Sequence, residues 1–76
     1  TTISYDMSED NFVNLTIFDL AGKKIKTLLN ESMVAGFRSV RWRGLDEQYQ
    51  PVSTGVYLCV FQAGNFRETK KIILLK

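Results

Sequence analysis

The chain has 76 residues, which is enough for one small domain. Its composition is that of an ordinary globular protein, and its net charge of +2 is too small to predict a nucleic-acid partner or a membrane surface. It has no histidine, which removes the usual general base and the commonest metal ligand, and its single cysteine excludes an internal disulfide.

The first half of the chain is predicted to form strands separated by short polar segments. In the second of these strands Val13, Leu15 and Ile17 share one face, because side chains alternate along a strand. Gly22 supplies the positive φ of the turn that follows it, and residues 30–36 are expected to form a loop. The predicted strands are Thr2–Met7, Phe12–Asp19, Lys24–Leu29 and Phe37–Arg43.

The second half begins with the longest connection, residues 44–55, which carries the only proline, Pro51. A strand is predicted at Val56–Ala63. Gly64 and Asn65 form a two-residue turn of the kind that favours hairpins. The returning strand is predicted at Phe66–Leu75. No window supports an amphipathic helix or a membrane span, so the sequence predicts an all-β domain.

The strand at Val56–Ala63 is apolar on both faces, which predicts a central position in a sheet. One of its faces is expected to meet residues of the second and fourth strands across a sandwich. The predicted core consists of Leu15, Ile17, Val40, Trp42, Tyr57, Cys59 and Phe61. On the other face, Leu58 and Val60 either contact a neighbouring domain or partner, or are ordinary apolar surface residues.

Neither catalysis nor a cofactor is predicted. The acidic pairs at residues 9–10 and 46–47 lie in predicted loops and lack the spaced oxygen ligands of a calcium site. Cys59 has no histidine to activate it and is interpreted as a small buried hydrophobe. The sequence therefore offers no catalytic residue, no metal ligand set and no cofactor site.

A single-stranded nucleic-acid surface is the alternative interpretation of Trp42 and the arginines around it. Strand alternation places Arg41 and Arg43 on the face opposite Trp42, so the aromatic ring and these charges do not form one surface. Trp42 is therefore interpreted as the core anchor of a sandwich, and no nucleic-acid partner is predicted.

Two long segments carry a family resemblance: "VNLTIFDLAGKKIKTLLNESMVAGFRSVRWRG" and "PVSTGVYLCVFQAGNFRETKKIILLK". They resemble the type A C-terminal sorting domains of type IX secretion cargo and the related immunoglobulin-like domain of flagellar hook-capping proteins. The shared features are a turn after an apolar strand, a glycine-to-tryptophan strand, a "GVY" start and an "AG" hairpin. Their residues here are Asp19, Gly22, Ile25, Gly36, Val40, Trp42, Gly55, Val56, Tyr57, Ala63 and Gly64. The family often has glycine near the position of Tyr49 and an aromatic residue in place of Cys59.

The resemblance implies an immunoglobulin-like antiparallel β-sandwich of about seven strands. Residues 1–76 would form a single non-catalytic domain from a longer secreted protein, which reaches the cell surface or the medium through the periplasm. Its partner would be the outer-membrane secretion machinery or a neighbouring domain, without membrane insertion. The family's lysine-bearing terminal strand makes Lys70, Lys71 and Lys76 the candidate recognition residues. The alternative is a structural module of a flagellar hook cap or of an extracellular enzyme.

Overall fold

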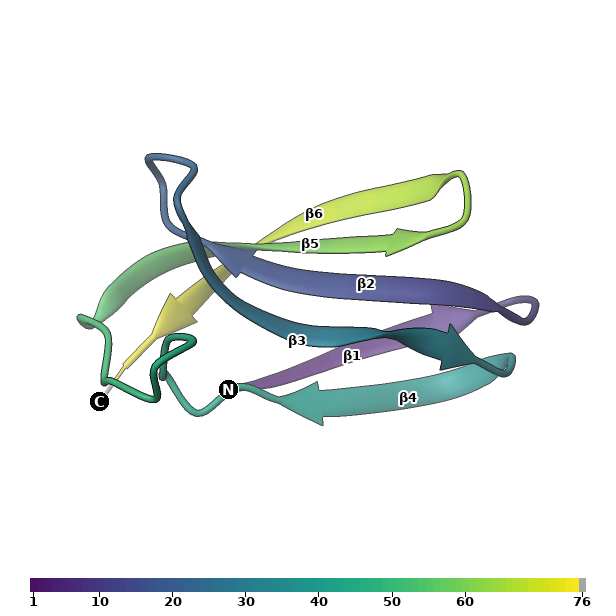
Figure 1. Ribbon diagram of the computed structural model, residues 1–76, viewed down its shortest axis with the longest axis horizontal. Helices are drawn as coiled ribbons and strands as arrows, with labels where there is room; N and C mark the ends of the chain where they lie inside the picture. The colour runs from purple at the N-terminus through teal and green to yellow at the C-terminus, as the bar shows by residue number, and fades with distance from the viewer. Residues whose placement is uncertain (76) are drawn as a thin grey trace.

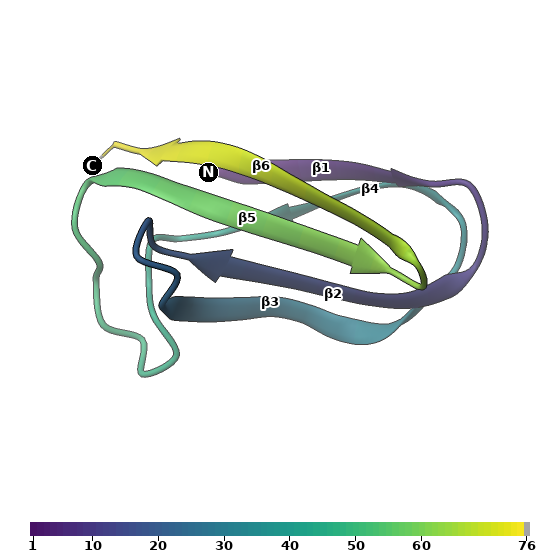
Figure 2. The same ribbon diagram turned by 90° about the horizontal axis from the view of Figure 1, so that it is seen from above.

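A computed structural model of the chain describes residues 1–75 and contains two antiparallel sheets packed as a sandwich (Figure 1). The strands are β1 (Thr2–Met7), β2 (Asn11–Phe18), β3 (Lys24–Met33), β4 (Gly36–Arg41), β5 (Gly55–Ala63) and β6 (Phe66–Leu74). One sheet pairs β1 with β4, and the other has the order β3-β2-β5-β6. The view in Figure 2 shows β1 on the side of the sandwich where β6 lies. Within residues 1–75 no helix could span a membrane.

The predicted all-β sandwich is confirmed, with six strands in the described residues where the resemblance implied about seven. The long connection between β4 and β5 contributes only one isolated bridge, between Leu45 and Pro51. Two left-handed residues, Gly44 with φ 75° and Tyr49 with φ 61°, turn the backbone there. Because such residues interrupt an extended strand, this segment loops across the end of the sandwich.

The third strand is longer than predicted. The expected loop beginning at Asn30 is wrong, because β3 continues to Met33 and pairs with β2 along its whole length. The extension is polar, and its Asn30 side chain accepts a hydrogen bond from the Asn14 amide at 3.2 Å. Asparagine and serine are poor strand formers by propensity, and here the neighbouring strand overrides that preference.

The core lies between the sheets and is built mainly on β2 and β5. All the residues predicted for it are buried except Val40, which is partly buried and packs against the rest. One prediction about their arrangement is wrong. Leu15 pairs with Phe61 and Ile17 with Cys59 within one sheet, so these residues are lateral neighbours and do not face each other across the sandwich.

The opposite sheet closes the core with β1 and with Trp42, which follows directly after β4. The indole of Trp42 is 1% exposed, and its N–H donates to the Leu45 carbonyl at 3.0 Å. Its ring meets the Tyr57 ring edge-on, with 5.1 Å between the centroids. A ring enclosed in this way anchors the core and offers no free face for base stacking.

Candidate recognition surface on the terminal strand

The hairpin of β5 and β6 positions the terminal strand against the rest of the domain. Its turn contains Gly64 with φ 60°, a conformation that residues with a Cβ adopt at a cost. A Cβ at this position would also collide with the Asn11 side chain. The left-handed φ therefore favours glycine at this turn, whereas the Asn11 amide is the end of a flexible side chain and can move aside.

β6 is an edge strand whose far end is held by one buried side chain. Leu74 is 6% exposed and packs against Gly44, which leaves room for it by having no side chain. Ile72 points the same way and is partly buried, whereas Ile73 and Leu75 point outward and are 61% and 78% exposed. The terminal strand is thus anchored on its inner face and open on its outer face.

The structure separates the candidate recognition lysines. Lys70 pairs with Cys59 on the inner face of the sheet and forms an ion pair with Glu68, with 3.5 Å between Nζ and Oε1. Lys71 pairs with Leu58 on the outer face, and its side chain is exposed. Lys76 lies outside the described residues. The two described lysines therefore belong to two different surfaces.

The outer face of the four-stranded sheet carries a continuous apolar stripe beside Lys71. Register places Phe18 next to Leu58 and Val56 next to Ile73. We call this set, with Val60, the outer apolar stripe. All of its members except Ile73 are partly buried. Sequence reasoning singled out Leu58 and Val60 but missed Phe18 and Ile73, which only strand register brings beside them.

Cys59 of β5, which lies beside Lys70 of β6, is not an activated nucleophile. Burial raises the pKa of the Cys59 thiol to about 11, and the nearby Lys70 charge offsets only part of that rise. Burial also raises the pKa of Tyr5, whose hydroxyl donates to the Met33 sulfur at 3.2 Å. Cys59 is therefore protonated at neutral pH and acts in packing. Among residues 1–75 no cluster of three or more His, Cys, Asp or Glu side chains is placed to hold a metal ion.

One comparison with known proteins gives a match to this chain. A protein-family model described as "Secretion system C-terminal sorting domain" matches residues 1–75. The matched range begins before β1 and ends after β6, so it includes both sheets and the terminal strand. No curated protein and no solved structure matches the chain.

Proposed function

We propose that this chain, which belongs to the family of secretion system C-terminal sorting domains, is recognised at the outer face of β6. As a sorting domain it directs its cargo through the outer-membrane type IX translocon, by way of the periplasm, to the cell surface or the medium. The family is a sorting signal and is non-catalytic. The proposal concerns which surface of the domain the secretion machinery binds.

The observation that carries the proposal is the exposure of β6 on an otherwise well-packed hairpin. Its outer face presents Lys71 and Ile73 beside the outer apolar stripe. Its outer edge is unpaired within the described residues, so its backbone groups are available to an added strand of a receptor. Leu74 fixes the position of this strand from the inside, which presents the surface in one orientation.

Lys71 supplies the specific polar contact in this proposal. Within residues 1–75 it forms no ion pair, whereas Lys70 is paired with Glu68. An exposed ammonium group next to an apolar stripe suits a receptor with an acidic group at the rim of an apolar patch. Lys76 is proposed to act with it, because the resemblance places a lysine-bearing strand at the end of the domain.

The experiment uses residues 1–76 fused behind a periplasmic reporter in a host with type IX machinery. The variants are Lys71→Glu and Lys76→Glu, with Lys70→Glu as the matched control on the inner face. We expect Lys71→Glu to lower export about tenfold, which corresponds to a loss of about 1.4 kcal/mol of binding free energy. The control should export as the unchanged domain does. Urea denaturation of each purified domain verifies that it is folded.

Two results would contradict the proposal at different levels. If the unchanged domain is folded but leaves the reporter in the periplasm, residues 1–76 are not a sufficient signal. If Lys70→Glu lowers export as much as Lys71→Glu, recognition does not depend on the outer face of β6. A folded Leu74→Ala variant with reduced export would further support a strand whose orientation matters.

A further inference from the structure

The inner face of β6 is uncovered over the first half of the strand. Register with β5 places Phe66, Glu68 and Lys70 on the side that faces the core, opposite Ala63, Phe61 and Cys59. All three are nevertheless exposed. β1 is an edge strand of the smaller sheet, and its Ser4 and Tyr5 line one hollow together with Glu68 and Lys70 of β6, so this part of β6 borders an open space.

The edge of β1 that faces this opening has free backbone groups at regular spacing. Thr1 and Trp42 exchange both backbone hydrogen bonds, at 2.8 and 3.1 Å. Hydrogen-bonded pairs alternate along an antiparallel ladder, so the N–H and C=O of Thr2, Ser4 and Asp6 point away from β4. Within residues 1–75 no strand pairs with them.

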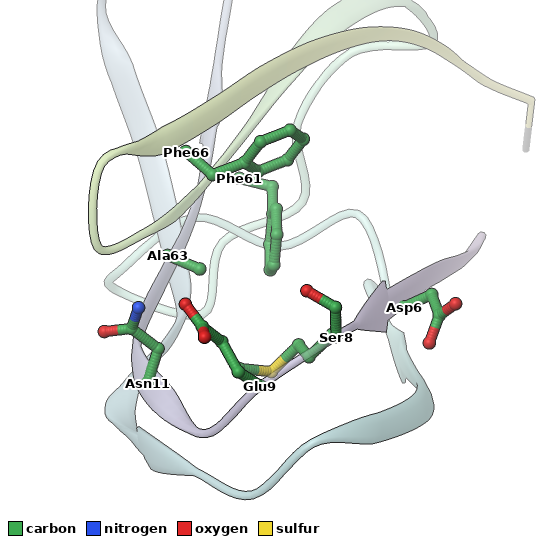
Figure 3. Close-up of a pocket in the computed structure, with 8 residues that line it drawn as sticks. Asp6, Ser8, Glu9, Asn11, Phe61, Ala63 and Phe66 are labelled. Carbon is green, nitrogen blue, oxygen red and sulfur yellow. The ribbon is translucent and has the colours of Figure 1, made fainter.

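A groove runs between this edge and β6. It has a volume of about 370 Å³, and we call it the β1–β6 groove. Its principal lining residues are Ser4, Asp6, Phe37, Phe61, Phe66 and Lys70. At the hairpin end it adjoins a second hollow, where Ser8 points toward the Phe61 ring and the Glu9 carboxylate lies on the side of Ala63 and Asn11 (Figure 3).

We propose that the β1–β6 groove binds an extended segment of a partner polypeptide, which adds a third strand to the sheet of β1 and β4. The free groups of Ser4 and Asp6 supply the ladder bonds that such a strand needs. Its inward side chains would cover Phe66, which is 56% exposed and meets the Phe61 ring edge-on with 6.2 Å between the ring centroids. An added strand would therefore complete the smaller sheet.

The charge of the groove specifies the chemistry of the occupant. Asp6 and Glu9 lie at the hairpin end, and Lys70 is already paired with Glu68. The occupant should therefore carry a basic residue where it passes the two carboxylates and apolar residues where it passes Phe61 and Phe66. Phe37, which is 75% exposed beside Asp6, would cover the aliphatic stem of that basic residue.

The groove suits a single strand better than a second copy of this domain. Antiparallel pairing of β1 with another β1 requires a two-fold axis perpendicular to the sheet. That axis would place the four-stranded sheets of both copies on the same side of the shared β1 sheet. The β6 strand of one copy would then lie over the space that β1 of the other copy must occupy. The two β6 strands would then compete for one space, whereas an isolated strand meets no such obstacle.

The test uses isotope-labelled residues 1–76 and a synthetic probe. The probe is an acetylated and amidated heptapeptide of alternating valine and threonine, with lysine at both ends. At saturating concentration we expect the amide hydrogen exchange of Ser4 and Asp6 to slow by at least about tenfold. Ser4→Pro should abolish this protection, because proline removes the edge N–H while edge strands tolerate it.

Ser39→Pro is the matched control. Ser39 lies directly opposite Ser4, so its N–H points to the free edge of β4. This variant should keep the protection of Ser4, and urea denaturation should show both variants folded. The proposal is overturned if the peptide protects no β1 amide, if it protects β6 amides in their place, or if Ser4 becomes protected without peptide as protein concentration rises. Because this site is not the outer face of β6, the peptide test and the export test can fail separately.

Discussion

β5 and β6 are the two strands of one hairpin and have nine residues each, yet their surroundings differ at almost every position. β5 has a neighbouring strand on both edges, and its Tyr57, Cys59 and Phe61 side chains are buried. β6 has one neighbour, and within it only Leu74 is buried. The two strands share one turn and one register, so the difference arises from their positions in the sheet.

This difference separates stability from recognition. Substitutions in β5 act on the core and therefore on the free energy of unfolding. Substitutions on the exposed positions of β6 should change that free energy by about 1 kcal/mol or less, and in the proposed function they act on the binding of a partner to the edge. In the proposed function β5 keeps the domain folded and β6 binds the receptor, so the two roles lie on adjacent strands.

The largest expected effect compares aromatic residues on the two strands. Phe61→Ala removes a ring that is 7% exposed and should lower the free energy of unfolding by about 3–5 kcal/mol. Phe66→Ala removes the more exposed ring that meets it edge-on and should cost about 1 kcal/mol. Urea denaturation of both variants measures the contrast.

Because small domains are near the lower end of the usual 5–15 kcal/mol range, Phe61→Ala should be largely unfolded at 37 °C. Phe66→Ala should keep a cooperative transition. Equal losses for the two variants would mean that the edge strand carries as much of the core as the central strand, which would remove the basis of the comparison.

A second prediction concerns the pH dependence that Cys59 gives to β5. Its pKa is raised to about 11 in the folded state from an ordinary value of 9.0. The unfolded chain therefore loses this proton first. The stability due to the neutral buried thiol is complete below pH 9 and is lost as the pH rises from 9 to 11, by about 2–3 kcal/mol in total.

The measurement is the free energy of unfolding of the unchanged domain and of Cys59→Ala at pH 8 and pH 11. The difference between the two proteins isolates the thiol from the lysines, which also titrate in this range. We expect the advantage of the unchanged domain to shrink at high pH. A constant difference, or rapid reaction of Cys59 with a thiol reagent in the folded state at pH 8, would place the thiol near solvent.

The contrast between the strands was only partly predictable from sequence. Alternation correctly separated the two faces of β5, because a period of two is a local property. The strands that pair with β5 were harder to predict, since pairing joins segments that are distant in the chain. This is why Leu15 and Ile17 were placed across the sandwich when they lie beside β5 in the same sheet.

The positive φ of Tyr49 is a backbone feature that the sequence analysis did not predict. The family often has glycine near this position, and Tyr49 adopts φ 61° in the long connection. The Lys26 ammonium lies 4.4 Å from the centroid of its ring, a cation–π contact between β3 and the long connection. The family's glycine near this position was a signal for a left-handed residue, but a tyrosine does not show that conformation by its type, and its contact with Lys26 joins distant segments.

For the candidate site, Lys70 was grouped with Lys71 in the sequence analysis, although consecutive residues of a strand point to opposite faces and parity could have separated them. The open inner face of β6 was not predictable in the same way. It depends on where β1 and β6 lie relative to each other in the folded domain, and this placement joins segments that are distant in the chain.

The smallest expected effect is on stability at the lysines themselves. Lys70→Ala removes a partly exposed ion pair with Glu68, and Lys71→Ala removes an exposed side chain above Leu58. Exposed pairs contribute little because water screens the charges and the side chains lose entropy when they are held together. Both variants should therefore unfold within about 0.5 kcal/mol of the unchanged domain in urea. Lys71→Ala should also lower export of the fused reporter while Lys70→Ala does not. If Lys71→Ala lowers the free energy of unfolding enough to unfold the domain, β6 contributes to the core as β5 does. A loss of export would then result from unfolding and would not measure recognition.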